Sequence, residues 1–463
     1  MLKPVVDEAG WQQHEAGVRA LRRSYTAIPP DAPVRLAKPT TNLFRSRTDV
    51  NVPGLDVSGL RGVIEVDAGG RTADVQGMCT YEDLVAATLP HGLIPLVVPQ
   101  LRTITLGGAV TGLGIESTSF RNGLPHESVL EMDVLTGGGE IVTVKRGDRL
   151  FDAFANSYGS LGYATRLRIE LEAVPEYVEL RHVRFSDLDR LAEAVEVITG
   201  TRTWEGVRVD GLDGVAFRPG EAYLTLATWS DRPGPTSDYT GDTIYYRSIQ
   251  ERQTDRLTMH DYLWRWDTDW FWCSGAFGLH DPRVRRLWPR RWRRSDVYHR
   301  LVRLDQRVGV SRRLDARKGL SRERVIQDIE VPVSGLRDFL DWFDAEVGMR
   351  PVWLCPLRLR ETDGPGSARA WPSYPLDPGT TYVNAGFWGT VPIADGRQDG
   401  DVNRSVEAKV TELGGHKSLY SDAYYDRPTF DALYGTANLA AVRKEFDPDG
   451  RLTELYDKAV KHR

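Results

Sequence analysis

Four glycines stand close together in the stretch from residue 105 to residue 117, at Gly107, Gly108, Gly112 and Gly114. Small and apolar residues separate them, rather than the polar residues typical of linkers. Glycines at this density let a backbone approach a ligand closely and turn its N–H groups towards it, which suits a pyrophosphate. The spacing is neither that of the dinucleotide fingerprint nor that of a P-loop, because no Gly-Lys-Ser/Thr follows. Taken alone, the stretch fits a glycine-rich turn between packed strands equally well.

Aromatic and polar side chains are interleaved between residues 255 and 278. The aromatic residues are Tyr262, Trp264, Trp266, Trp270, Phe271, Trp272 and Phe277. The polar residues include His260, Asp267 and Asp269. One interpretation is a tryptophan-rich part of the core with solvated charges. The other is an apolar tunnel for a long chain, with a few polar groups at its reactive end.

Residues 283–318 are strongly basic: thirteen Arg and one Lys against three Asp give a net charge of +11, in a chain whose total is −5. A nucleic-acid site is one interpretation of such a run, and a solvated arginine helix or one that pairs with a partner subunit is another. Interleaved residues such as Trp288, Trp292 and Leu301 fit the headgroup layer of an anionic membrane better. At about 1 kcal/mol per basic residue near the surface, a third of these residues would dock the protein reversibly. We therefore expect an anionic membrane surface, and no nucleic acid, as partner.

The whole chain has the composition of a globular protein, with 41% hydrophobic and 27% charged residues among 463. This length predicts two or three domains. No run of about 18 uncharged apolar residues occurs, and the N-terminus lacks the apolar core of a signal peptide. Three distant cysteines favour a reducing cytoplasm without a disulfide framework, and no Cys or His spacing predicts a metal site. We expect a cytoplasmic protein, peripheral on the inner face of the plasma membrane.

Elements that position these residues follow from periodicity and turn signals. We expect a helix over 5–24 and a short strand running into a polar turn over 34–45. Hairpins are expected over 62–76 and 129–144, a capped helix from Thr80 to Leu89, a short helix over 150–155 and a strand over 164–171. Later elements are a strand-helix segment over 183–198, paired strands over 210–228, strands over 325–332, 352–358 and 382–387, and helices over 336–346, 428–434 and 442–455.

The order of these pieces resembles the FAD-binding domain of vanillyl-alcohol-oxidase-type (PCMH-type) flavoproteins. The resemblance rests on six matches in order over about 130 residues, which is far more specific than a single Gly-Gly pair. They are Val75-Gln-Gly77, a helix, Pro90-His-Gly-Leu-Ile-Pro95, the Gly107-Gly108 stretch, Arg121-Asn-Gly-Leu124 with its following strand and glycine turn, and Gly159-Ser-Leu-Gly-Tyr163.

The resemblance implies an α+β protein, with a two-subdomain FAD-binding domain over 1–177 that is completed by 428–463. A substrate (cap) domain with an antiparallel sheet is implied over 178–427. It includes the basic, Trp-rich segment 255–318, which we expect from its composition to face the membrane. The cofactor-binding residues that it implies are Lys38, Pro39, Thr40, Thr41, Asn42, Thr105, Leu106, Gly107, Gly108, Thr111, Gly112, Gly114, Ile115, Glu116, Ser117, Gly159 and Gly162.

One loop departs from the family pattern, which often has Arg-Gly-Gly-Gly-Thr/Ser where this chain has Lys38-Pro-Thr-Thr-Asn42. Its hydroxyl and amide groups still offer donors to phosphate oxygens. Many relatives attach FAD through a histidine in this loop, and no histidine lies between His14 and His91. We expect non-covalent FAD.

Further motifs resemble the Δ24-sterol reductases over nearly the full length, and the chain as a whole resembles more closely actinobacterial flavoproteins that reduce 10-methylene fatty acyl lipids to 10-methylstearate (tuberculostearate). These motifs are Ile115-Glu-Ser117, Trp353-Leu-Cys-Pro356, Leu419-Tyr-Ser-Asp-Ala-Tyr424 and Leu455-Tyr-Asp-Lys458. The resemblance implies a lipid acyl substrate, NADPH as electron donor, and a methyltransferase in the preceding step. The segment ending at Arg427 also resembles decaprenylphosphoryl-ribose oxidases, which have a lysine near the position of Tyr424. An FAD oxidase of a lipid-linked sugar or other alcohol, a sterol side-chain reductase, and a binding protein with an inactive flavin fold are the alternatives.

Reduction of an isolated C=C bond needs an acid, because no carbonyl is present to stabilise an enolate. A buried carboxylic acid keeps its proton near neutrality, since burial raises its pKa. We expect Tyr424, Tyr420 and Cys355 to line the flavin face. The acid is expected among His260, Asp267, Asp269 and Tyr424, and the sequence does not choose between them.

Overall fold

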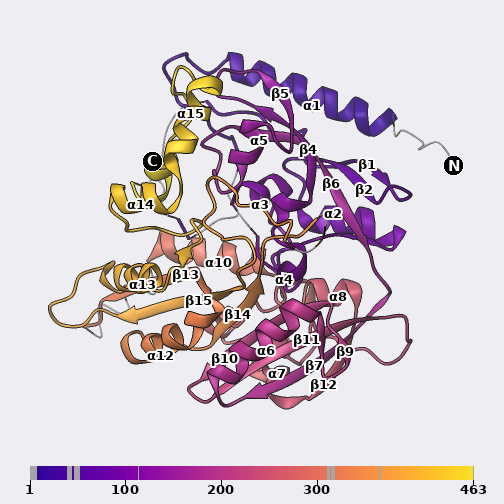
Figure 1. Cartoon of the computed structure of the whole chain (residues 1–463), viewed down its shortest axis with the longest axis vertical. Helices are drawn as coiled ribbons and strands as arrows, with labels where there is room; N and C mark the ends of the chain where they lie inside the picture. The colour runs from indigo at the N-terminus through magenta and orange to yellow at the C-terminus, as the bar shows by residue number, and fades with distance from the viewer. Residues whose placement is uncertain are drawn as a thin grey trace.

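The computed structural model describes residues 8–38, 44–45, 53–112, 114–309, 313, 319–362, 364 and 366–461. Two antiparallel sheets, each with its own covering helices, make up most of this part of the chain (Figure 1). The α+β class predicted from the sequence is therefore confirmed. Within the described ranges, no helix is both long and apolar enough to cross a membrane.

The first sheet is built from the N-terminal third of the chain. Its strand order is β1-β2-β6-β4-β5, and β3 pairs with β6 outside this path. Both predicted hairpins are present, and the first closes through a hydrogen bond of 2.9 Å from the Gly70 amide to Asp67 Oδ1. The strands are β1 (Val63–Asp67), β2 (Thr72–Gln76), β3 (Leu93–Pro95), β4 (Val129–Leu135), β5 (Ile141–Lys145) and β6 (Tyr163–Ala173).

The predicted capped helix is present as α2, with the expected signals at both of its ends. Thr80 caps α2 by accepting the Asp83 amide at 3.2 Å, and Gly92 follows with a left-handed backbone. The helices are α1 (Glu8–Thr26), α2 (Tyr81–Thr88), η1 (Leu89–His91), α3 (Leu106–Gly112), α4 (Ser119–Asn122), η2 (Pro125–Ser128) and α5 (Arg149–Phe154).

Two predictions in this part were wrong. The expected strand over 34–45 is absent from its described residues, because Leu36 makes only an isolated bridge to Leu55. The glycine stretch is also not simply a loop, since residues 106–112 form α3. Small residues allow this helix to lie close to β2 and β6, where a larger side chain would clash.

The second sheet has eight strands in the order β12-β7-β11-β10-β14-β15-β13-β16. Helices α6, α12 and α13 cover one face of its long central strands around one apolar core, and the other face packs into the core that contains the aromatic segment. The strands are β7 (Tyr177–Phe185), β10 (Gly211–Arg218), β11 (Glu221–Ser230), β12 (Thr254–Thr258), β13 (Arg322–Pro332), β14 (Val352–Leu357), β15 (Tyr382–Pro392) and β16 (His416–Lys417); β8 (Thr203–Trp204) and β9 (Val207–Arg208) form a separate ribbon.

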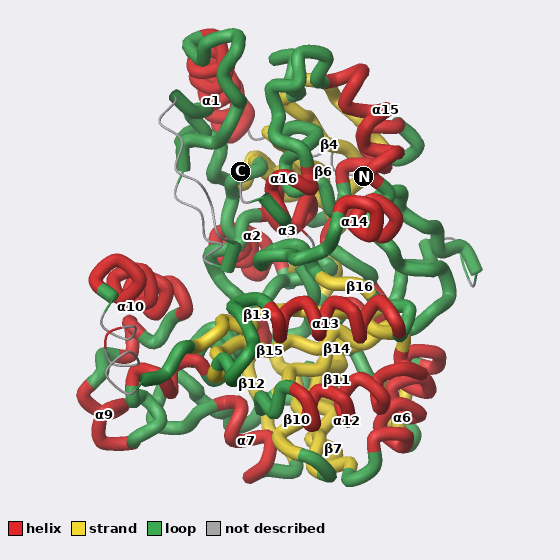
Figure 2. Tube along the Cα trace, turned by 90° about the vertical axis from the view of Figure 1, so that its left-hand side faces the viewer, coloured by secondary structure: helices red, strands yellow, loops and turns green. Residues whose placement is uncertain are grey.

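Helices of the second part fall into two groups. One group lies against the sheet, and the other, with α9 and α10, stands outside it on one side of the molecule (Figure 2). The helices are α6 (Leu188–Thr201), α7 (Tyr245–Glu251), α8 (Met259–Leu263), η3 (Cys273–Phe277), α9 (Pro282–Leu287), η4 (Arg290–Trp292), α10 (Ser295–Val308), η5 (Val333–Gly335), α12 (Leu336–Glu346) and α13 (Asp401–Glu412).

The end of the chain returns to the first sheet, as Figure 1 shows for the yellow helices beside the purple part. These helices are α14 (Arg427–Leu433), α15 (Thr436–Phe446) and α16 (Leu455–Ala459). Backbone hydrogen bonds of 2.9 Å from Val34 to Arg451 and of 3.0 Å from Gly138 to Phe446 join the two ends. The chain passes from the first sheet to the second between β6 and β7, and the domain division expected at residue 177 stays a prediction.

Candidate functional site

The structure contains a cavity of about 560 Å³. It is lined by residues in and beside both sheets, and by residues of the C-terminal part of the chain that returns to the first sheet. The glycine stretch and β6 provide one side of its wall, and the aromatic segment with β13, β14 and β15 provides another. Its volume is in the range of sites for cofactors and other large ligands. The cavity therefore joins the two features that the sequence singled out.

The glycines of α3 allow close packing around this cavity. A Cβ on Gly107 would lie 2.6 Å from the Gly77 carbonyl oxygen, to which the Gly107 amide donates at 2.9 Å. A Cβ on Gly114 would lie 2.5 Å from Cγ of Pro99. Gly108, in contrast, is exposed and lines the cavity. A side chain at 107 or 114 would clash with the wall behind it, whereas one at 108 would displace only the Thr105 hydroxyl, 2.8 Å from its Cβ, and would occupy ligand space.

Four basic side chains line the cavity: Arg35, Lys38, Arg45 and Lys458. Lys458 Nζ donates to the Tyr158 carbonyl at 3.0 Å, and the Arg45 guanidinium lies over the Tyr158 ring at 4.6 Å. These contacts hold the cations of Lys458 and Arg45 beside the turn that begins at Gly159. Their charge suits a phosphate or diphosphate group.

The remaining wall is aromatic. Phe44 stacks on Trp270 with ring centroids 5.8 Å apart, and the ring centroids of Phe271 and Trp388 lie 4.4 Å apart. Trp353 contacts Phe271 at 5.3 Å. Offset and edge contacts of this kind make a rigid apolar wall. Such a wall suits a planar ring and an apolar chain, and it keeps water out.

Trp270 and Phe271 form a strained turn, with φ of 45° and 59°. Bulky residues rarely adopt this left-handed backbone, and where they do the surrounding structure enforces it, often at a functional site. The Trp270 amide donates to the Asp267 carbonyl at 3.1 Å, and the Phe271 amide donates to the Trp266 carbonyl at 2.8 Å. The turn thus presents two aromatic rings to the cavity.

Asp267 and Asp269, two of the predicted acids, hold this turn in place and do not line the cavity. Asp267 accepts the Arg102 amide at 3.0 Å and the Ser295 hydroxyl at 2.6 Å. Asp269 forms a buried ion pair of 2.6 Å with Arg285. Burial raises the pKa of Asp267, while Arg102 opposes this effect. Both carboxylates are paired in the structure, and their predicted catalytic role stays untested.

A carboxyl group that does line the cavity is Asp328, on β13. Burial raises its pKa to about 7, although Asn384 and Tyr420 donate hydrogen bonds that favour its charged form. Asn384 Nδ2 lies 3.2 Å from Asp328 Oδ1. The Tyr420 hydroxyl in turn accepts the Trp388 indole N–H at 2.9 Å. Asp328 thus has the environment of an acid that keeps its proton near neutrality.

The other predicted catalytic residues lie in different places. Tyr420 lines the cavity, whereas Cys355 is fully buried in β14 and is not part of the cavity wall. Tyr424 packs against Gly400 and the Arg404 guanidinium, outside the cavity lining. His260 is exposed and contacts Asp261 at 3.2 Å. The structure therefore brings only Tyr420 of this group to the cavity, and the catalytic roles stay predictions.

The predicted cofactor-binding residues divide similarly. Glu116 and Ser117 are buried behind the wall, where Glu116 pairs with Arg265 at 2.9 Å and Ser117 contacts the Tyr262 hydroxyl at 2.6 Å. Leu106 is also buried without lining the cavity, and Pro39, Thr40, Thr41 and Asn42 lie outside the described residues. The predicted residues that line the cavity are Lys38, Thr105, Gly107, Gly108, Thr111, Gly112, Gly114, Ile115, Gly159 and Gly162.

Sequence reasoning missed Arg35, Arg45, His299 and Asp328. Asp328 lies in the strand predicted over 325–332, but Gln327 and Glu330 are polar residues of the same strand, so no local signal distinguished it. His299 lies in a helix dominated by arginine, and burial lowers its pKa to about 4, so its imidazole is neutral at pH 7. Nothing local identified the two arginines.

The residues present fit FAD. The exposed Gly108 and the basic side chains suit a diphosphate, and the aromatic wall suits an isoalloxazine ring. Among the residues that the structure describes, no group of three or more His, Cys, Asp or Glu is arranged to hold a metal ion.

Comparisons with known proteins agree with this fit. The chain is 23% identical over 452 residues to the Delta(24)-sterol reductase of Arabidopsis thaliana, covering 88% of this chain and 77% of the relative. It is 24% identical over 419 residues to the Delta(24)-sterol reductase of Homo sapiens, with 87% and 77% covered. Cytokinin dehydrogenase 6 of Oryza sativa subsp. japonica is 36% identical over 151 residues, or 31% of this chain and 29% of the relative. Residues 31–145 match the family described as FAD binding domain, so the chain carries an FAD-binding domain that contributes the glycine side of the cavity.

Proposed function

We propose that this protein is an FAD-dependent oxidoreductase that reduces an isolated C=C bond in a lipid. The substrate that we propose is the 10-methylene-stearoyl chain of a phospholipid, the product is 10-methylstearoyl, and NADPH is the electron donor. Support comes from the FAD-binding domain and from the similarity over 88% of the chain to a protein named Delta(24)-sterol reductase. The acyl substrate rests on the resemblance of the chain as a whole to actinobacterial reductases of 10-methylene fatty acyl lipids.

The chemistry requires a proton as well as a hydride. Reduced FAD, when bound, supplies a hydride. A hydride alone does not add to an unactivated alkene, because no carbonyl accepts the resulting charge. Protonation of the CH2 terminus generates positive charge at the tertiary carbon, and the hydride then forms the second C–H bond there. One proton and one hydride are consumed for each C=C bond reduced.

We propose Asp328 as the acid. Its pKa of about 7 leaves a large protonated fraction at neutral pH, and it lines the cavity together with Tyr420. The Trp388 indole fixes the Tyr420 hydroxyl, which hydrogen bonds to Asp328. Tyr420 thereby orients the carboxyl group, and it stabilises the carboxylate that remains after the proton has left.

The aromatic wall has two roles in this proposal. Phe44, Trp270 and Phe271 exclude water, which would otherwise capture a cationic centre. Their ring faces carry partial negative charge, and they attract a carbon centre that gains positive charge. The observation that carries the proposal is thus one cavity that holds glycine, basic and aromatic walls together with the half-buried carboxyl group of Asp328.

Mass spectrometry of membrane lipids tests the function in cells with and without the protein. Cells that lack it should accumulate 10-methylene chains, lighter than the 10-methyl product by two hydrogen atoms. Expression of the wild-type protein should restore the methyl form, whereas Asp328→Asn should not. Unchanged acyl chains in all strains would overturn the proposed substrate.

A sterol side-chain alkene is the second candidate substrate, because several relatives carry that activity in their names. Purified protein supplied in parallel with methylene-branched acyl lipid and with a Δ24-sterol separates the two. An alcohol oxidase would behave differently from either reductase. Under anaerobic conditions, NADPH should bleach the flavin of a reductase, whereas a sugar or alcohol should bleach that of an oxidase.

A further inference from the structure

The exposed apolar residues of this protein are concentrated on one part of its surface. Among the described residues, nine large hydrophobic side chains are exposed, and six of them lie between residues 284 and 320. Leu287 is 86% exposed, Leu304 57% and Trp292 46%. Scattered exposed hydrophobic residues are ordinary, but a concentration of this kind marks an interaction site.

Arginines surround these apolar residues. Arg283, Arg286, Arg290 and Arg291 are exposed in and after α9, and Arg300, Arg303 and Arg307 are exposed on α10. Within the described part of the chain, no carboxylate forms an ion pair with Arg283, Arg291, Arg303 or Arg307. Unpaired exposed cations raise the local potential and favour an anionic partner.

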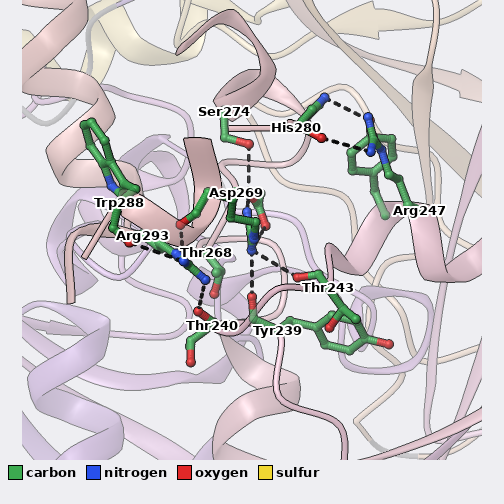
Figure 3. Close-up of polar contacts among 12 residues, drawn as sticks. Tyr239, Thr240, Thr243, Arg247, Thr268, Asp269, Ser274, His280, Trp288 and Arg293 are labelled. Atoms are coloured by element: carbon green, nitrogen blue, oxygen red, sulfur yellow. Dashed lines mark hydrogen bonds and ion pairs between the residues drawn. The ribbon is translucent and has the colours of Figure 1, made fainter. Parts of the chain in front are cut away.

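Two other arginines anchor this segment to the body of the protein. Arg285 pairs with Asp269 and donates to the Gly241 carbonyl at 2.9 Å. Arg293 donates to the carbonyl oxygens of Thr240 and Trp288, as Figure 3 shows. Both guanidinium groups are buried. The sequence run is therefore divided into arginines that fix the fold and arginines that face outwards.

The outer face of α10 has the spacing of an amphipathic helix. Residues 300, 303, 304, 307 and 308 are all exposed, and they lie three to four positions apart along one side. The opposite side carries Tyr298 and His299, which are buried, and His299 lines the cavity. α10 therefore carries exposed basic and apolar residues on one side and a residue of the cavity wall on the other.

We propose that the exposed residues of α9, η4 and α10 form a docking surface for an anionic lipid bilayer, with the cavity wall behind it. We call these residues the basic apolar surface: Arg283, Val284, Arg286, Leu287, Arg290, Arg291, Trp292, Arg300, Arg303, Leu304, Arg307 and Val308. Aliphatic side chains gain nothing from the phosphate backbone of a nucleic acid, but they enter the acyl boundary of a bilayer. Exposed Leu287 and Leu304 thus favour lipid over nucleic acid.

Vesicle sedimentation with the full-length FAD-loaded protein tests this surface without any substrate, so its outcome is independent of the proposed reaction. Wild-type protein should bind vesicles that contain a third phosphatidylglycerol and should not bind pure phosphatidylcholine. Each arginine near a membrane contributes about fivefold to binding, so Arg291→Gln, Arg303→Gln and Arg307→Gln together should weaken it on the order of a hundredfold. The matched control replaces the exposed Arg168, Arg184 and Arg190 by Gln and should bind normally.

A second pair of variants tests the apolar contribution. Leu287→Glu with Leu304→Glu should weaken vesicle binding by at least tenfold, whereas Val197→Glu with Val207→Glu, at exposed sites elsewhere, should not. FAD content checks that each variant is folded. Equal binding by wild type and both Gln triple variants would overturn the proposal. Tighter binding to duplex DNA than to anionic vesicles would also overturn it, as would self-association through Leu287 and Leu304 without vesicle binding.

Discussion

Replacement of Asp328 by Asn should stop alkene reduction and yet stabilise the protein. Asn keeps the size and hydrogen-bonding capacity of the side chain but holds no transferable proton. Loss of a positioned general acid lowers a rate by about 10²–10⁴-fold, or about 3–5 kcal/mol in the barrier. Reduction of the flavin by NADPH does not use this proton, so its rate should stay within about threefold of wild type.

The pKa of Asp328 fixes the direction of the stability change. It is raised from 3.8 to about 7 by burial, so the folded protein binds this proton more tightly than the unfolded chain does. The ionised carboxyl therefore lowers the stability of wild type as pH rises from about 4 to 7. Three pKa units correspond to about 4 kcal/mol, and cavity water offsets part of this, so Asp328→Asn should gain about 2–4 kcal/mol at pH 8 and little below pH 4.

Two assays measure these effects on the same protein. Stopped-flow mixing of reduced enzyme with alkene gives the reaction rate, which in wild type should fall about tenfold per pH unit above about pH 7. Urea denaturation at about pH 8 gives the free energy of unfolding. Asp341→Asn, at an exposed carboxylate on α12, is the control for both. An Asp328→Asn protein with alkene reduction within threefold of wild type would refute the reasoning.

Other substitutions test the remaining parts of the site. Gly108→Leu should weaken FAD binding at least tenfold without unfolding the protein, because the leucine side chain enters the cavity. Titration of the apoprotein with FAD measures the affinity, and an unchanged affinity would contradict the prediction. Asp267→Ala should lower the free energy of unfolding by about 2 kcal/mol in urea, because it leaves the Arg102 amide and the Ser295 hydroxyl without their acceptor; an unchanged midpoint would exclude this anchoring role. Tyr420→Phe should slow alkene reduction at least tenfold, whereas Tyr424→Phe, outside the cavity lining, should change it less than threefold; equal rates would contradict the assignment.

Local signals in the sequence predicted most of the elements. The Thr80 cap, the hairpin at Gly69-Gly70 and the helix over 336–346 rest on contacts between neighbouring residues, and all three are present. The glycine stretch lines the cavity, and its helical form depends on close packing against Gly77. Such packing is a tertiary contact, and no local pattern reveals it.

The reactive end of the site was harder to predict for the same reason. The sequence predicts Asp267 and Asp269 as candidate acids because they stand among tryptophans. Their ion-pair partners, Arg102 and Arg285, lie outside this aromatic segment. Asp328 stands in a strand that also carries Gln327 and Glu330, and only the fold brings it to the cavity with Tyr420. Tertiary contacts decide whether a carboxylate lines the cavity or is held in an ion pair. Residue type and spacing therefore did not distinguish Asp328 from Asp267 and Asp269.

A single-turnover experiment tests the central claim most directly. FAD-loaded protein is reduced chemically, mixed without oxygen with a 10-methylene acyl phospholipid, and followed by flavin absorbance and lipid mass spectrometry. We expect the flavin to reoxidise while one acyl chain per flavin gains two hydrogen atoms. A flavin that stays reduced with this lipid and with a Δ24-sterol, but reoxidises on admission of oxygen, would contradict the account.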